Sequence, residues 1–155
     1  LPCGPFALEV IHTPGHHPGH ISLFEPNAGF LFAGDMLGLE VPFYTPGSGG
    51  ATGFLESMEK LRSRKATCVL PSHGAPILDA EQAVLEASGK VTRRDVRVLE
   101  ALDRAPLTFR ELLPNLFRNE DRHLFPGAAI LASHLERLET GGRIREEKGR
   151  YHLQV

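Results

Sequence analysis

Four short apolar runs in the first half of the chain each stop at a turn with Pro or Gly, and this pattern restricts the fold most. We expect strands over 6–12, 21–24, 30–33 and 67–70, because short β-branched or aromatic runs bounded by such turns are typical of strands. The run 30–33 is apolar throughout, which predicts a strand covered on both faces. Apolar residues at three- and four-residue steps predict a helix over 52–64. Strand, helix and strand in this order predict an α/β fold of helix on sheet.

Polar residues follow three of these predicted strands. His16, Asp35 and His73 each lie just past a strand end, with Pro or Gly nearby. Strand ends at one edge of a sheet can bring distant residues together, and a neighbouring glycine lets the backbone approach an ion closely. Two imidazoles and a carboxylate suit zinc, with iron and manganese as less selective alternatives. Spacing alone leaves open that Asp35 forms a turn and that the histidines belong to a nonspecific His-rich tract.

Three motifs carry a family resemblance. Residues 12–20 have the sequence His-Thr-Pro-Gly-His-His-Pro-Gly-His. This segment resembles the His-Thr-Pro-Gly-His-x-x-Gly-His signature of the metallo-β-lactamase superfamily, in its hydroxyacylglutathione-hydrolase-like (glyoxalase II-like) branch. Residues 32–37 (Phe-Ala-Gly-Asp-Met-Leu) and 70–76 (Leu-Pro-Ser-His-Gly-Ala-Pro) resemble the next two motifs, in the family's order. The resemblance implies the second half of an αββα metallo-β-lactamase sandwich.

The resemblance also implies a role for each motif residue. His16 would bind one metal, His73 would bind the other, and Asp35 would bridge both metals and act in catalysis. The cofactor would be two zinc ions, with iron or manganese as alternatives. Metal-bound hydroxide would then attack an ester or thioester of a small molecule.

Other residues are expected to surround this site. His12 and His20 would support the metal ligands, since a ligating imidazole needs partners that fix its tautomer. His17 occupies a position at which the family signature allows any residue, and it is expected to be exposed. The loop 39–50, with Phe43 and Tyr44, follows Asp35 and is expected to flank the substrate. A plain surface connection is the alternative for this loop.

One departure from the family pattern limits the activity that we expect. The family's first metal motif, His-x-His-x-Asp-His, is absent, and the chain has no Asp-His dipeptide. We therefore expect the sequence to be the latter part of a longer enzyme, with a naturally degenerate member as the alternative. Each metal would have one histidine and a share of Asp35, which is fewer than the three protein ligands that a catalytic zinc ion usually takes. The chain alone is therefore expected to be inactive.

The sequence predicts two domains. Residues 1–88 would form the metallo-β-lactamase-like part and residues 89–155 a winged-helix-like α+β domain, which the resemblance also implies for a subgroup of the family. A helical stretch over 80–103 should be interrupted near Ser88-Gly89. Thr108 and Glu111 resemble a capping box that opens a helix. A helix over 127–139 and two short strands, 143–147 and 150–153, should follow.

A winged helix raises nucleic acid as an alternative partner, for a ribonuclease or a binding module. Residues 90–155 hold thirteen Lys and Arg against ten Asp and Glu, whereas residues 1–89 hold four against nine. Four cations mark the predicted hairpin: Arg143, Arg145, Lys148 and Arg150. Against this, helix 127–139 carries Glu136 and Glu139 beside Arg137, and groove-reading helices usually carry cations or amides. A packing or substrate-lid role is therefore favoured.

Composition bounds the location of the protein. Two cysteines do not form a disulfide framework, so a reducing cytoplasm is expected, and Cys68 is expected to be buried. The longest apolar runs fall short of the roughly 20 residues that a membrane span needs. The sequence leaves the oligomeric state undecided, with a homodimer as one alternative.

Overall fold

The computed structural model describes residues 1–38, 43–117 and 126–154. The chain divides into two compact units, Leu1–Lys90 and Val91–Val155, whereas the sequence predicts a division between residues 88 and 89. The boundary lies within the long helix α2 (Ala80–Arg104).

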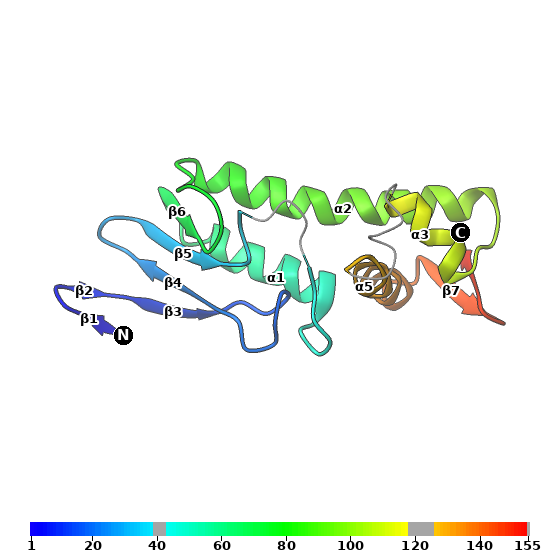
Figure 1. The fold of residues 1–155 in the computed structure, drawn as a ribbon, viewed down its shortest axis with the longest axis horizontal. Helices are drawn as coiled ribbons and strands as arrows, with labels where there is room; N and C mark the ends of the chain where they lie inside the picture. Colours follow the sequence, from blue (N-terminus) through cyan, green and yellow to red (C-terminus); the bar gives the residue numbers. More distant parts are fainter. Residues whose placement is uncertain (39–42, 118–125, 155) are drawn as a thin grey trace. The chain divides into compact units, whose positions relative to one another are not determined.

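A four-stranded sheet in the order β3-β4-β5-β6 forms the centre of the first unit (Figure 1). Its strands are β3 (Glu9–His12), β4 (Ile21–Glu25), β5 (Phe30–Gly34) and β6 (Cys68–Pro71). Neighbours pair antiparallel from β3 to β5, and β6 pairs parallel with β5. A hairpin of β1 (Pro2–Cys3) and β2 (Phe6–Ala7) precedes the sheet. The single strand predicted over 6–12 is therefore two strands, β2 and β3.

Helix α1 (Gly50–Arg62) connects β5 to β6 and lies along the sheet in Figure 1. Its apolar stripe is buried at Phe54, Met58 and Leu61, as the periodicity predicts. Leu31 of β5 and Val69 of β6 are also fully buried. This helix-on-sheet core confirms the mixed α/β class.

The other face of the sheet is apolar and exposed. Its most exposed members are between 39% and 50% accessible: Val10, Ile21, Phe30 and Phe32. The register puts Val10 beside Leu23, and Leu23 beside Phe32, so these residues share one face. The prediction that strand 30–33 is covered on both faces is wrong for the described residues, because only its alternate positions, Leu31 and Ala33, are buried.

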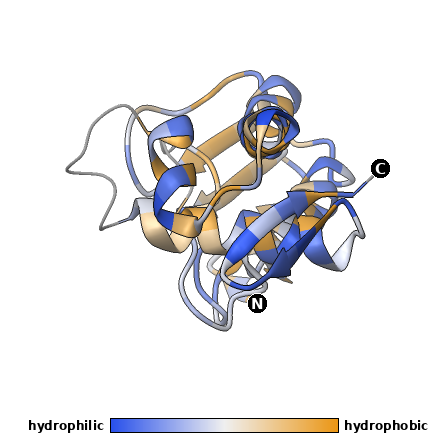
Figure 2. Cartoon of the chain, turned by 90° about the vertical axis from the view of Figure 1, so that its right-hand side faces the viewer, coloured by the Kyte–Doolittle hydropathy of each residue, from blue (hydrophilic) through white to orange (hydrophobic). Residues whose placement is uncertain are grey.

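Helix α2 is continuous over 25 residues, so the interruption predicted at Ser88-Gly89 is wrong. One glycine costs a helix only about 1 kcal/mol relative to alanine, and buried positions continue on both sides of it, at Val84, Ala87, Val91 and Val98. In Figure 2 the helices carry both hydrophobic residues, in orange, and hydrophilic residues, in blue.

The second unit continues with α3 (Phe109–Leu116), α5 (Gly127–Thr140) and an antiparallel hairpin of β7 (Ile144–Glu147) and β8 (Arg150–Leu153). The capping box is confirmed: the Thr108 side chain accepts from the Glu111 N–H, and the Glu111 carboxylate accepts from the Thr108 N–H. The hairpin around Lys148-Gly149 is confirmed as well. Among the described helices, none is long and apolar enough to cross a membrane.

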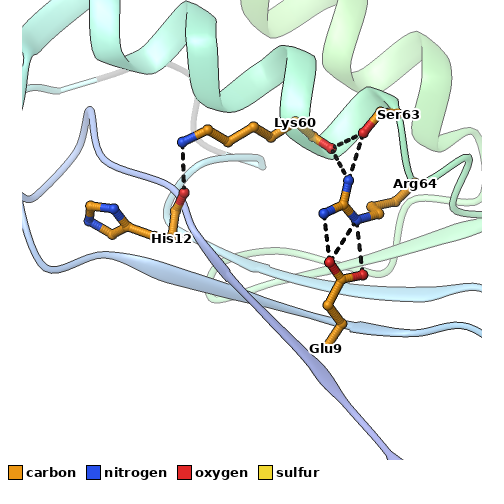
Figure 3. A network of polar contacts seen from close by, with 5 residues as sticks. All are labelled: Glu9, His12, Lys60, Ser63 and Arg64. Atoms are coloured by element: carbon orange, nitrogen blue, oxygen red, sulfur yellow. Dashed lines mark hydrogen bonds and ion pairs between the residues drawn. The ribbon is translucent and has the colours of Figure 1, made fainter.

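A polar network ties α1 and the turn that follows it to β3 (Figure 3). The Arg64 guanidinium donates to both carboxylate oxygens of Glu9, at 2.6 to 3.1 Å. Hydrogen bonding from Arg64, more than its charge alone, lowers the pKa of Glu9 below its ordinary value of 4.5. This bidentate pair fixes the end of α1 against the strand that leads to the histidine-rich loop.

We predict that Arg64→Ala lowers the free energy of unfolding by about 0.2–1 kcal/mol at neutral pH, the range of partly exposed ion pairs. Because the pKa of Glu9 is lowered in the folded state, the contribution is complete above pH 4.5 and is lost as the pH falls through the folded pKa. Urea denaturation at pH 7 and in acid measures the effect. Arg93→Ala, which removes an exposed arginine, is the control; an Arg64→Ala effect of equal size at both pH values would contradict the prediction.

A buried polar group lies in the second unit, where His134 of α5 is fully buried. Its Nδ1 lies 2.6 Å from Asp95 Oδ1, and Asp95 Oδ2 lies 3.3 Å from Arg137 Nε. Burial lowers the pKa of His134 below its ordinary value of 6.5, against the opposing effect of Asp95. The imidazole therefore stays neutral where an unfolded histidine would gain a proton.

We predict that the second unit loses stability as the pH falls below 6.5, because the unfolded state then binds a proton that folded His134 excludes. The slope has an upper bound of about 1.4 kcal/mol per pH unit. Urea denaturation between pH 7.5 and 5 measures it, and His134→Gln should flatten it. His17→Gln, at an exposed histidine, should keep the wild-type slope; a flat wild-type profile would refute the prediction.

Candidate metal centre

The sheet topology explains why three distant loops meet. Strand β3 is antiparallel to β4 and β4 is antiparallel to β5, so β3 and β5 run in the same direction, and β6 is parallel to β5. The carboxyl ends of these three strands, at His12, Gly34 and Pro71, therefore lie at one edge of the sheet. The loop after each strand carries one of the predicted metal ligands.

The structure brings His16, Asp35 and His73 together at this edge. His16 Nε2 lies 3.5 Å from Asp35 Oδ2, and His73 Nε2 lies 3.3 Å from Asp35 Oδ1. Each imidazole thus faces a different oxygen of one carboxylate. The side chain of His73 is 69% exposed, whereas those of His16 and Asp35 are 22% and 30% exposed. The His73 side of the group is therefore open to solvent.

The donor set fits a cation. Imidazole nitrogen and carboxylate oxygen are both zinc ligands, and a buried Asp35 Oδ1 and a buried His16 Nδ1 have no hydrogen-bond partner among the described residues. Within those same residues, no group of three or more His, Cys, Asp or Glu side chains is arranged to hold one ion. The fit to a cation therefore rests on the donor types and on the two unpartnered atoms.

His20 supports Asp35 from behind. Its Nε2 accepts a hydrogen bond from the Asp35 backbone N–H at 3.2 Å, and its Nδ1 lies 2.9 Å from Thr13 Oγ1. The Thr13 hydroxyl in turn lies 3.0 Å from Ser22 Oγ. Since Nε2 accepts, the proton of a neutral ring is on Nδ1 and points to Thr13. Burial, and then the charge of His16, lower the pKa of His20 and favour this neutral form.

The other histidines of the loop lie further out. His12 is exposed, and its Nε2 donates to the Pro18 carbonyl at 2.7 Å, so it braces the loop backbone. His17 is exposed, as expected, and its Nδ1 accepts from the Gly19 N–H. The sequence patterns do not select Thr13 as a site residue. Its place in the His-Thr-Pro-Gly-His motif is the feature that could have indicated this role.

The predicted substrate loop divides into two parts. Residues 39–42 lie outside the described residues. Phe43 makes an edge contact with His16, with ring centroids 5.6 Å apart. Tyr44 is 2% exposed, and its ring packs edge-on against Phe54 of α1 at 5.9 Å. Tyr44 is thus a buried residue that packs on α1, and its place beside a substrate stays a prediction.

Comparisons with known proteins agree on one superfamily. Residues 2–73 match the family model described as the Metallo-beta-lactamase superfamily. The Beta-lactamase-like protein 2 homolog of Drosophila melanogaster is 27% identical over 150 residues, which cover 91% of this chain and 48% of the relative. A metallo-beta-lactamase family protein from Thermus thermophilus has a solved structure with a TM-score of 0.84 and 30% identity, covering 99% of this chain and 52% of that chain.

A further relative bears on chemistry. The Atrochrysone carboxyl ACP thioesterase AgnL7 of Paecilomyces divaricatus is 29% identical over 114 residues, or 68% of this chain and 35% of the relative. The chain spans about half the length of the Drosophila and Thermus proteins. Together these matches support the metallo-β-lactamase superfamily, whose members are generally metal-binding hydrolases.

We predict that Gly34→Ala disturbs the His20 support. Gly34 has φ +56°, and a Cβ there would lie 2.5 Å from His20 Nε2. Left-handed backbone alone costs alanine roughly 1–2 kcal/mol, and the displaced imidazole adds to it. Urea denaturation gives the stability, and the ring signals of His20 in NMR spectra report its displacement.

Gly4→Ala is the matched control for this substitution. Gly4 has φ +58°, and a Cβ there would have no neighbour within 4 Å. The control should lose the stability that left-handed backbone costs an alanine, and it should leave the His20 signals unchanged. Equal losses of stability and unchanged His20 signals in both variants would contradict a close His20 contact.

Proposed function

We propose that this chain supplies one part of the metal centre of a metallo-β-lactamase-fold hydrolase that acts on an ester or thioester. The observation that carries the proposal is the Asp35 carboxylate with His16 at one oxygen and His73 at the other. A relative named as a thioesterase favours acyl substrates. The hydroxyacylglutathione-hydrolase-like signature over residues 12–20 favours the same class.

Each residue would have a separate task. His16 and His73 would each hold one metal, and Asp35 would bridge the two. Zinc, when bound, lowers the pKa of a coordinated water and polarises the scissile carbonyl; iron and manganese are the alternatives. His20 would hold the Asp35 backbone through its neutral ring, and Phe43 would limit the approach of substrate beside His16.

The exposed sheet face indicates that this unit packs against a further layer of structure. A contiguous apolar sheet face is normally covered by another layer, and Val10, Phe30 and Phe32 are all more than a third exposed. In an αββα sandwich, a second sheet would cover this face. We propose that such a sheet also brings the remaining metal ligands, with a homodimer as the alternative source of cover.

The second unit is proposed to be a winged helix with a packing or lid role. Helices α3 and α5 followed by the β7–β8 hairpin agree with that pattern. Two of the four hairpin cations already have acidic neighbours: Arg145 lies 3.4 Å from Glu147, and Arg150 lies 3.3 Å from Glu111. This pairing lowers the positive charge offered to a phosphate backbone, so nucleic-acid binding ranks second.

We predict that the isolated chain binds Zn²⁺ only in the micromolar range or more weakly, because each ion would have one histidine and a shared carboxylate. Calorimetric titration with Zn²⁺ measures the affinity. Asp35→Asn, His16→Ala and His73→Ala should each weaken it, while His17→Ala, at an exposed neighbour, should not. Hydrolysis of a model thioester should stay at the background rate.

Two outcomes would revise the proposal. Nanomolar zinc affinity together with hydrolysis would show that further ligands complete the site within this chain. Equal affinities for the wild type and the three ligand variants would refute the metal assignment itself. Metal content after purification, and melting with and without a chelator, provide an independent check.

A further inference from the structure

The loop that carries His16 is held by a row of hydrogen bonds to its own carbonyl groups. The Lys60 ammonium donates to the His12 carbonyl at 3.1 Å (Figure 3). The Ser57 hydroxyl donates to the Pro14 carbonyl at 2.6 Å. Two further donors, the Ser48 hydroxyl and the Thr45 N–H, reach the carbonyls of residues 15 and 16 at 2.5 and 3.0 Å. We call these four donors the carbonyl clamp.

All four donors come from one stretch of chain, residues 45–60, which includes most of α1. Their acceptors lie more than 25 positions earlier in the sequence. Ser57 is fully buried within α1, a helix in which a serine side chain can face solvent or bond to the carbonyl four residues before it. Its hydroxyl instead points out of the helix to Pro14. Ser48, 2% exposed, is similarly directed at the loop.

Close backbone packing accompanies the clamp. Gly15 is buried at φ +136°, and a Cβ there would lie 2.7 Å from the Cα of Phe54. A Cβ on Gly53 would lie 2.8 Å from the Ser48 carbonyl oxygen. The loop backbone, the Ser48 turn and α1 therefore meet without intervening side chains. The residue that follows Gly15 is His16, so the orientation of its imidazole depends on this packing.

We propose that Ser48 and Ser57 are positioning residues for His16. By fixing the carbonyls of Pro14 and Gly15, they hold the backbone that aims the His16 imidazole at Asp35. The inference rests on the proposed function for its consequence in metal binding, although the positioning itself is a property of the chain without metal. Outer partners of metal ligands commonly change affinity by about 10–100-fold when they are removed.

The first experiment measures positioning without metal. Ser57→Ala and Ser48→Ala are compared with wild type by the NMR signals of the histidine rings. The His16 signals should shift or broaden in both variants, and those of exposed His17 should stay in place. Ser48→Thr, which keeps a hydroxyl, should restore the wild-type His16 signals. Ser63→Ala, whose hydroxyl donates to the Lys60 carbonyl at the end of α1, is the matched control and should change nothing at His16.

The second experiment uses Co²⁺ as the metal probe and follows its visible absorption during titration. Each alanine variant should raise the apparent Kd for Co²⁺ by about 10-fold, with Ser63→Ala unchanged. Unchanged His16 signals in well-folded Ser48→Ala and Ser57→Ala would overturn the proposal. If the two alanine variants alter the His16 signals but Co²⁺ binds the wild type and Asp35→Asn equally well, the metal assignment in the proposed function is refuted and the clamp is supported.

Discussion

The parallel pairing of β5 with β6 is the constraint on which the candidate metal centre depends. It places Gly34 beside Pro71, so the residues that follow these strands, Asp35 and His73, lie side by side. The connection between the two strands must cross over the sheet, and α1 makes that crossing. The same helix then provides part of the clamp on the third loop, which carries His16. One crossover therefore arranges all three ligand loops.

Polar groups at this edge show two different kinds of environment. Behind the site, hydrogen bonds link Ser22, Thr13 and His20 to the backbone of Asp35. In front, buried nitrogen and oxygen atoms of His16 and Asp35 have no hydrogen-bond partner among the described residues. Buried polar atoms without hydrogen-bond partners are costly, and these two atoms therefore support the proposal of a bound ion. A cation is the ligand that nitrogen and carboxylate donors favour.

The two units differ in how they use buried charge and polarity. In the first unit, buried hydroxyl groups hold a loop in a defined shape. In the second, a buried histidine whose pKa is lowered by burial, a carboxylate and an arginine form a compact group between α2 and α5. The first arrangement lies beside the candidate site at the sheet edge, whereas the second is the basis of the predicted pH dependence of its unit's stability. The apolar sheet face of the first unit has no comparable partner among the described residues.

The sequence by itself predicted most of the elements and the candidate metal ligands. Periodicity located α1, the turns located the strand ends, and the motifs selected His16, Asp35 and His73, because these signals depend on residues close in sequence. Only the tertiary structure decided what depends on distant packing. Tyr44 became a core residue because Phe54 lies against it, Phe30 and Phe32 were left exposed because no described layer covers them, and α2 ran through Ser88-Gly89 because its buried stripe continues on both sides. The clamp on His16 joins residues more than 25 positions apart, and local patterns carry no information at that range.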